Sequence, residues 1–289
     1  MGDGFEPDTC SSAQFSSLSY FRTFALSHFG TVKLRFLGTG TSFGVPVIGC
    51  RCATCTSADP RDRRTRHGAL VEAEGRRLLV DTPPELRLQL VEAGVDSVDG
   101  IWFTHCHADH IHGLDDVRVF SERSRAPLQV YAGADCADTL RARFAYVFDP
   151  RIRATEGTSK PEARLTTVRP YEEVEAAGFR VLPLPVPHGP MEVLGFRIGR
   201  LGYITDGKML PPGTLDALRG VRVLVLNALW FGRPHPTHFS VEEAVAAAEA
   251  VGAERTYLTH LSHQTGHAEL ERRLPPGVRP SFDGLEVEI

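Results

Sequence analysis

The sequence lacks an apolar run long enough to cross a membrane. A transmembrane helix needs roughly 20 consecutive apolar residues, whereas Arg222 and Asn227 interrupt the most apolar stretch, residues 221–229. That stretch is more typical of a buried strand. The first 30 residues also lack a cationic start followed by an apolar block, so they do not predict a secretory leader. We therefore expect a cytoplasmic protein that does not bind membranes.

An excess of charge of one sign is also missing. The formal net charge of the 289 residues is −4, and only three of the 32 basic residues are lysines. This balance excludes a nucleic-acid binder held by overall charge, although a local basic patch remains compatible with it. The hydrophobic fraction of 42% excludes a mainly disordered chain.

Strand and helix signals begin near Val32 and continue to the C-terminus. They predict one α/β domain over residues 32–289, with two sheets and outer helices, after an irregular extension over residues 1–31. The expected strands are 33–37, 69–73, 77–80, 100–104, 128–131, 179–184, 194–198, 201–205, 223–226 and 255–259, with 285–289 as an edge strand. The expected helices are 83–93, 134–146, 212–218 and 240–251, and residues 151–165 are expected to form a flexible loop.

Four side chains of metal-ligand type fall within six positions, directly after the expected strand 101–103. They are His105, His107, Asp109 and His110. In extended backbone, residues two apart point to the same side, so the first two imidazoles lie together. Imidazoles and carboxylates suit a hydrolytic divalent metal. We interpret the run as part of a site for two ions that share a water; a histidine-rich surface loop is the alternative.

Three of the six cysteines, Cys50, Cys52 and Cys55, also lie within six residues. Three thiols this close suit a metal better than a disulfide framework. A structural zinc requires four ligands, and no fourth cysteine is in range, so His263 is the best candidate for the fourth. Reduced, inert thiols are the alternative. Cys10, Cys106 and Cys136 are scattered, and without an export signal a reducing cytosol is expected.

The run His-x-His-x-Asp-His resembles the signature of the metallo-β-lactamase superfamily. Three later residues, each near a strand end, follow in that family's order: His188, Asp206 and His260. The resemblance implies an αββα sandwich of two mixed sheets flanked by helices. It also implies that one metal takes His105, His107 and His188, that the other takes Asp109, His110 and His260, and that Asp206 bridges them.

Two further residues are judged against the same family pattern. Asp81, after the strand 77–80, matches an early aspartate whose expected role is to hold the second ring nitrogen of a ligand histidine. An ordinary solvated aspartate is the alternative. His112 lies two positions beyond the signature, and the pattern does not use it, so we expect it outside the ligand set.

A finer resemblance rests on four short segments: Gly-Thr-Gly at 38–40, Gly-Cys-x-Cys-x-x-Cys at 49–55, Thr-His-x-Ser-His at 259–263 and Phe-Asp-Gly at 282–284. Together they resemble the phosphoribosyl 1,2-cyclic phosphate phosphodiesterases of bacterial phosphonate breakdown. This subgroup implies two catalytic divalent ions (manganese or zinc), one structural zinc and a small phosphodiester substrate opened by a metal-bridging hydroxide. It assigns Asp109 to orienting that nucleophile and makes a homodimer possible.

The subgroup also has a histidine outside the metal shell that acts on the substrate. His238 matches it best, and His235 is the weaker candidate. Just before a helix start, His238 is placed to hold phosphate or to protonate a leaving alkoxide. A surface histidine in a proline-rich loop is the alternative.

Two other classes of function are compatible with these residues. The same core would also suit cyclic nucleotides, RNA 3′ ends or another ester, although no basic insertion for gripping RNA is evident. A non-catalytic zinc-binding module is disfavoured, because a degenerate relative would be expected to lose ligands.

Overall fold

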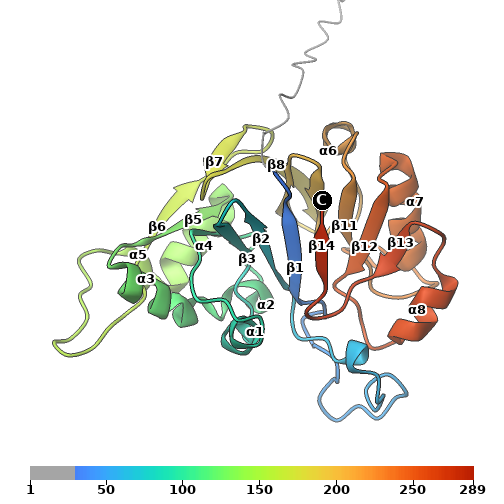
Figure 1. Cartoon of the computed structure of the whole chain (residues 1–289), viewed down its shortest axis with the longest axis horizontal. Helices are drawn as coiled ribbons and strands as arrows, with labels where there is room; N and C mark the ends of the chain where they lie inside the picture. Colours follow the sequence, from blue (N-terminus) through green and yellow to red (C-terminus); the bar gives the residue numbers. More distant parts are fainter. Residues whose placement is uncertain (1–29) are drawn as a thin grey trace, which may run out of the picture.

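Two stacked sheets with helices on both outer faces make up the protein (Figure 1). The computed structural model describes residues 30–289, so the predicted extension over 1–31 lies almost wholly outside the described residues. The layer order is the αββα sandwich that the sequence predicts. Each sheet contains both parallel and antiparallel pairs.

The first sheet has the strand order β14-β1-β2-β3-β4-β5-β6. The pairs from β14 to β3 are antiparallel, and those from β3 to β6 are parallel. Its strands are β1 (Lys33–Gly38), β2 (Gly68–Ala73), β3 (Arg76–Val80), β4 (Gly100–Trp102), β5 (Leu128–Ala132), β6 (Ala163–Thr167) and β14 (Glu286–Glu288).

The second sheet has the order β13-β12-β11-β10-β9-β8-β7. The pairs from β7 to β10 are antiparallel, and those from β10 to β13 are parallel. Its strands are β7 (Val174–Ala176), β8 (Phe179–His188), β9 (Met191–Ile198), β10 (Leu201–Tyr203), β11 (Val223–Asn227), β12 (Arg255–Thr259) and β13 (Val278–Pro280).

The helices cover the two outer faces. The first sheet carries α1 to α5 and the second carries α6 to α8 (Figure 1). Their bounds are α1 (Leu86–Glu92), α2 (Ala108–Ile111), α3 (Arg118–Ser124), α4 (Ala134–Arg143), α5 (Ala145–Phe148), α6 (Pro212–Leu218), α7 (Val241–Val251) and α8 (His267–Arg273), with short 3₁₀ turns at Pro60–Asp62 and Leu114–Val117.

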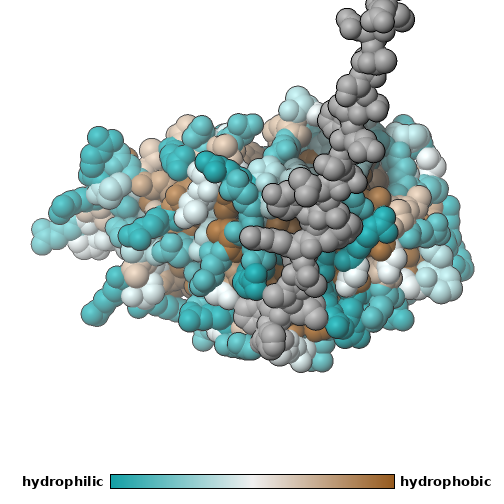
Figure 2. Space-filling view, turned by 90° about the horizontal axis from the view of Figure 1, so that it is seen from above, coloured by the Kyte–Doolittle hydropathy of each residue, from teal (hydrophilic) through white to brown (hydrophobic). Residues whose placement is uncertain are grey.

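Hydrophobic side chains fill three layers. The central layer joins the inner faces of both sheets and includes Trp102, Phe196 and Tyr203, all fully buried. Two further clusters lie between each sheet and its helices. Seen from above, hydrophilic residues dominate the two ends of the molecule and hydrophobic residues show mainly toward the middle (Figure 2). No helix among residues 30–289 is long and apolar enough to span a membrane.

Several predicted elements differ from the observed ones. The helix expected over 83–93 is confined to α1, and the one expected over 134–146 is split into α4 and α5. The expected loop 151–165 ends earlier, because β6 begins at Ala163. The strand expected to end at Leu184 continues to His188. Its alternate prolines are tolerated because β7 pairs with β8 only up to Val181, so no strand among residues 30–289 pairs with that edge beyond this point and no N–H is needed there.

The Gly-Thr-Gly turn after β1 depends on close backbone approach. A Cβ at Gly38 would collide with the Arg66 carbonyl oxygen, and one at Gly40 would lie 2.6 Å from that of Arg64. Asp283 of the Phe-Asp-Gly motif secures the turn, because its carboxylate accepts hydrogen bonds from the backbone N–H of Thr39 (2.8 Å) and of Thr65 (2.7 Å). This turn also holds the segment after β12, because the Leu261 N–H donates to the Thr39 carbonyl.

Candidate metal centre

The candidate ligands lie where strands of both sheets end. His105 and His107 follow β4, and His188 is the last residue of β8. Asp206 follows β10, and His260 directly follows β12. Strands that run in the same direction end at the same edge of their sheet, which is why residues far apart in the sequence meet here. Asp109 and His110 lie in α2, the short helix that begins directly after His107.

One group of imidazoles comprises His105, His107 and His188, whose ligand-type nitrogens lie within 4.8 Å of one another. His105 Nε2 is 3.0 Å from His107 Nδ1. His188 is oriented by its other nitrogen, since Nδ1 lies 3.1 Å from the carbonyl oxygen of Thr237. Three imidazoles with converging nitrogens form a typical half of a hydrolytic metal site.

A second group comprises Asp109, His110 and His260, again within 4.8 Å. Asp109 Oδ2 is 3.5 Å from His110 Nε2 and 3.8 Å from His260 Nε2. All three residues are buried. Although burial alone would lower it, the carboxylates around His110, with Asp109 the strongest, raise the pKa of this imidazole to about 10. The surrounding carboxylates therefore favour positive charge at this position.

Asp206 lies between the two groups. Its Oδ1 is 3.6 Å from His110 Nε2, and its Oδ2 is 3.9 Å from His105 Nε2. Although burial alone would raise it, the neighbouring imidazoles, His260 foremost, hold the pKa of Asp206 well below its usual range. The carboxylate is therefore ionised and central, which is the position that the predicted bridging role requires.

The backbone at this site adopts conformations that are rare for residues other than glycine. Asp81, Asp206 and His260 all have positive φ, at 61°, 53° and 55°. Such strain persists where the surrounding structure determines it, and it clusters at functional sites. In each case the strand ends at a sharp turn that presents the side chain to the site.

The buried polar atoms fit a pair of divalent cations. His110 Nε2 and His260 Nε2 are buried without a hydrogen-bond partner among residues 30–289, which is costly unless a cation or water satisfies them. The donors are imidazoles and carboxylates, a set that suits Zn, Mn or Fe. The ligand assignment of each residue stays a prediction, but all seven candidates are brought together.

Asp81 lies beneath this centre and is fully buried. One oxygen accepts from the Thr104 N–H at 2.8 Å, and the other lies 2.7 Å from His110 Nδ1. Thr104 in turn contacts His105, with Oγ1 3.1 Å from Nδ1. Asp81 therefore orients one histidine of each group, and the alternative of a solvated aspartate is wrong.

Replacing Asp81 by asparagine is expected to weaken binding of the catalytic ions about 10–100-fold, the range typical of such supporting partners. The asparagine keeps the shape but removes the charge that fixes the His110 tautomer. Competition with a coloured chelator measures the affinity. Asp99→Asn, at an exposed ion pair with Arg76, is the control; equal affinities in the two variants would contradict the supporting role.

His67 was not singled out by the sequence, although it is fully buried and lies against the second group. Its Nε2 is 2.8 Å from the Tyr203 hydroxyl, and its ring packs against His110 and His260 at centroid distances of 5.4 and 6.1 Å. Burial lowers the pKa of His67 well below its usual value, so the ring is neutral. A lone histidine before a strand carries no signal that separates this role from a surface position.

His238 lies against the centre, not on a remote surface. Its Nε2 is 3.1 Å from Asp206 Oδ2, and its ring is 4.6 Å from that of His188. His188, Asp206 and His238 form a further group of ligand-type atoms within 4.8 Å. His235 is one step further out, with Nδ1 3.3 Å from His238 Nδ1. His112 is exposed and belongs to none of these groups.

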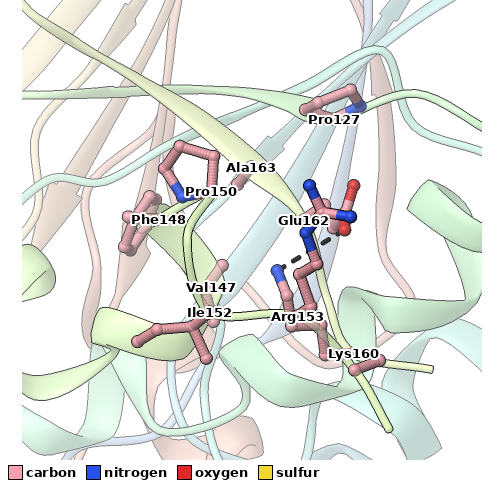
Figure 3. A pocket seen from close by; sticks show the side chains of 10 residues that line it. Pro127, Val147, Phe148, Pro150, Ile152, Arg153, Lys160, Glu162 and Ala163 are labelled. Carbon is pink, nitrogen blue, oxygen red and sulfur yellow. Dashed lines mark ion pairs between the residues drawn. The ribbon is translucent and has the colours of Figure 1, made fainter. Parts of the chain in front are cut away.

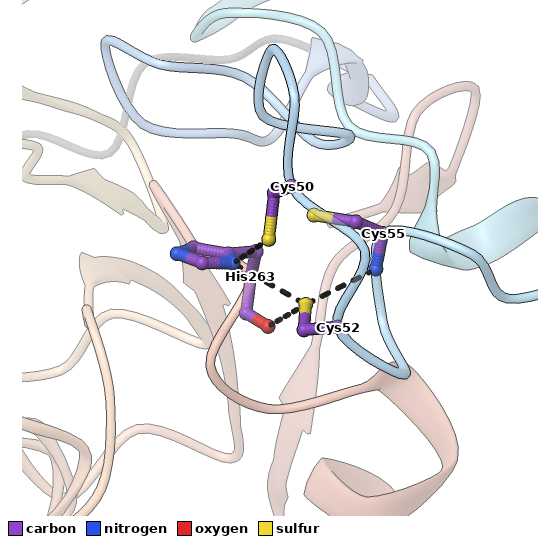
Figure 4. A group of neighbouring side chains, drawn as sticks. All are labelled: Cys50, Cys52, Cys55 and His263. Atoms are coloured by element: carbon purple, nitrogen blue, oxygen red, sulfur yellow. Dashed lines mark hydrogen bonds between the residues drawn. The ribbon is translucent and has the colours of Figure 1, made fainter.

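The cysteine loop and His263 also come together. The Cys50 and Cys52 sulfurs lie 3.5 and 3.4 Å from His263 Nδ1, and Cys55 completes the group (Figure 4). Hydrogen bonds from the Cys55 N–H and from His263 lower the pKa of the Cys52 thiol to about 6. Four converging ligands with an ionisable thiol fit a structural zinc.

Two of the scattered cysteines, Cys106 and Cys136, form a disulfide. Cys106 lies between His105 and His107, and Cys136 lies in the first turn of α4. The expectation of a uniformly reducing setting gave no reason to anticipate this bond, and neither did the spacing of 30 residues.

Comparisons with known proteins agree with this geometry. Residues 76–261 match the Beta-lactamase superfamily domain. The chain therefore belongs to the metallo-β-lactamase superfamily, and fold and site together define a hydrolase with His/Asp metal sites.

More particular similarities fall within the same superfamily. The crystal structure of a new diphosphatase from the PhnP family is similar to this chain, with a TM-score of 0.83 and 39% sequence identity. The similarity covers 90% of this chain and 98% of the diphosphatase. An octanoyltransferase of Porphyromonas gingivalis is 38% identical over 88% of this chain, but the chain spans only 51% of it. A ribonuclease Z of Mycobacterium sp. (strain KMS) is 29% identical, over 70% of this chain and 79% of its own length.

Proposed function

We propose that this protein is a metal-dependent phosphodiesterase that opens a small cyclic phosphate, such as phosphoribosyl 1,2-cyclic phosphate. The observation that carries the proposal is the position of His238, which adds a proton-bearing group beside the two groups of metal-ligand type. The 39% identity to a PhnP-family diphosphatase, together with the cysteine loop, supports a phosphorus centre as the target.

Each residue has a distinct task in this proposal. The first group and the second group would each hold one divalent ion, with Asp206 shared between them. When bound, the two ions supply Lewis-acid charge and lower the pKa of a water. Asp109 orients that nucleophile toward phosphorus, and His238 donates a proton to the leaving oxygen. Burial lowers the pKa of His238 and so disfavours its protonated form, whereas the hydrogen bond and charge of Asp206 oppose this shift and favour the proton that the role requires.

His238→Ala is expected to reduce turnover of a substrate with a poor alkoxide leaving group by about 10²–10⁴-fold. An activated aryl phosphodiester leaves without a proton, so its hydrolysis should fall much less. Steady-state rates on both substrates measure the contrast. Equal losses on both would indicate a phosphate contact in place of proton donation.

The metal content of the same variant decides between two roles for His238. We expect the metal content of the variant to match that of the wild type, because each ion keeps the three ligands of its own group. Loss of one ion would make His238 a ligand and would overturn its role as the acid. Unchanged rates on both substrates would show that His238 takes no part in the reaction. His112→Ala, in an exposed side chain of the α2 segment, is the matched control.

A phosphoric anhydride is the second candidate substrate, because the PhnP-family relative is a diphosphatase. The two candidates differ in the bond that breaks, since an anhydride leaves a phosphate that needs little protonation. A screen of purified protein against cyclic ribose phosphates, cyclic nucleotides, diphosphates and model phosphodiesters, with Mn and with Zn, separates them. Preference for the diphosphates would replace the phosphodiesterase proposal.

RNA 3′ ends are favoured less, despite the ribonuclease Z relatives. The loop after α5 projects from the molecule (Figure 1), but residues 149–162 contain three basic and three acidic residues and so have no net charge. A hollow of about 420 Å³ lies between this loop, α5 and β6, where Lys160 pairs with Glu162 at 3.5 Å (Figure 3). A balanced surface of this kind gives little attraction for phosphates.

The remaining parts of the proposal concern setting and assembly. We propose that the Cys50, Cys52, Cys55 and His263 group holds a structural zinc, and that the protein acts in the cytoplasm, where such thiols stay reduced. A homodimer is proposed by analogy with the subgroup alone. Sedimentation of the purified protein measures the mass directly, and a monomer at working concentration would contradict that part.

A further inference from the structure

The Cys106–Cys136 disulfide ties a metal-ligand segment to a neighbouring helix. Cys106 is flanked on both sides by residues of the first imidazole group, and its Cα lies 5.2 Å from that of Cys136. Consecutive side chains of extended backbone point to opposite sides. His105 and His107 therefore face the centre, while the sulfur between them faces α4.

The disulfide lies beside the least supported residue of the first group. His105 is held by Thr104, and His188 by the Thr237 carbonyl. His107 is the exposed member, and its side-chain hydrogen bond is to His105, itself part of the group. The position of His107 therefore depends on its own backbone, which the disulfide fixes one residue away.

The second group does not depend on this bond in the same way. His110 is clamped by Asp81, at 2.7 Å, and lies inside α2. His260 is supplied by the opposite sheet, where the Gly-Thr-Gly turn holds the following residue through Leu261 N–H. Opening the disulfide therefore leaves the supports of this group intact.

The sulfurs are placed for exchange with a small thiol. Cys106 is only partly buried, whereas Cys136 is 9% exposed, so Cys106 is the more accessible of the two residues. Attack of a dithiol on the disulfide passes through a mixed disulfide and ends with two protein thiols and an oxidised reductant, a transfer of two electrons and two protons. In a cytosolic protein such bonds are typically transient and redox-sensing.

We propose that Cys106 and Cys136 are a reversible redox modification site whose oxidation tightens metal binding by the His105, His107 and His188 group. The inference rests on the proposed function only in requiring that this group binds an ion. Oxidised, the segment holds His107 in place before the ion arrives. Reduced, the segment keeps only weaker ties, such as the hydrogen bonds from His110 N–H to the His107 carbonyl and from Arg143 to the Cys106 carbonyl. The ion must then supply part of the order, so affinity falls.

Metal affinity of the oxidised and the reduced protein tests this directly. The protein is titrated with Zn²⁺ and with Mn²⁺ against a coloured chelator, before and after treatment with a phosphine reductant, and alkylation with mass spectrometry counts the free thiols. We expect reduction to weaken one catalytic ion about tenfold, as when a ligand loses its support, and to leave the other unchanged.

Two variants make the result specific. Cys136→Ser should show the weaker affinity with or without reductant, while Asp138→Ser, an exposed neighbour in α4, should respond as the wild type does. Full binding of both ions with no response to reduction would overturn this inference alone. Alkylation of both cysteines after exposure to an oxidised dithiol would do the same. Failure to bind any catalytic ion in either state would overturn the proposed function as well.

Discussion

Asp109→Asn is expected to abolish hydrolysis, with a loss of roughly 10³-fold or more, while the protein remains folded. The reason is that Asp109 contacts both histidines of its group, at 3.5 and 3.8 Å, whereas its own side chain belongs to none of the hydrophobic clusters. His107→Ala is expected to behave alike, because it removes one of only three imidazoles in the first group.

Turnover at matched metal content, together with the melting temperature, measures this result. Matching the metal is essential, since loss of an ion and loss of a nucleophile-orienting carboxylate both lower activity. His112→Ala again serves as the control, as it changes a histidine of the same segment outside the groups. Turnover like that of the wild type in either variant would remove that residue from the centre.

Cys52→Ser is expected to destabilise the protein strongly and to release one zinc per chain. A structural zinc contributes folding free energy outright, about 10 kcal/mol or more in small zinc domains. If only a third of that is lost here, at roughly 2–4 °C per kcal/mol, the melting temperature falls by about 10 °C. Calorimetry and metal analysis on the same sample measure both quantities.

The matched control for this variant is Arg51→Ser, at the exposed position between two of the ligand cysteines. It introduces the same side chain into the same loop and should keep both the zinc and the melting temperature. An unchanged zinc content in Cys52→Ser would show that its sulfur is not a ligand. Molecules of Cys52→Ser that stay folded and keep their catalytic ions should retain much of the wild-type turnover, because the substitution acts mainly on stability.

Much of the fold could be predicted because its local signals agree with its tertiary structure. The capping box at Ser240 and Glu243 is present, and α6 has the predicted bounds Pro212–Leu218. Short elements such as β7 and β13 were missed, because three residues carry no usable period. Strand β6 was missed because it is polar and half exposed at the edge of its sheet.

The candidate site was predictable where its residues cluster in sequence or follow strands, and less so elsewhere. The spacing of the ligand-type residues from His105 to His110 identifies them in the sequence. His67 has no such neighbours, and only the fold brings it against the centre. The disulfide partners are 30 residues apart and meet because β4 and β5 are neighbours. Positive φ at Asp81 and Asp206 likewise depends on packing that no local pattern records.

The segment after β12 contributes to two metal groups at once, with His260 in one and His263 in the other. Arg64, buried between the cysteine loop and β2, donates to the Ser262 carbonyl at 2.6 Å and so holds the residue that lies between the two histidines. If the cysteine group holds zinc as proposed, loss of that zinc would disturb the segment that also carries His260. Zinc supply would then act on the catalytic centre through the position of a single residue, whichever ions that centre holds.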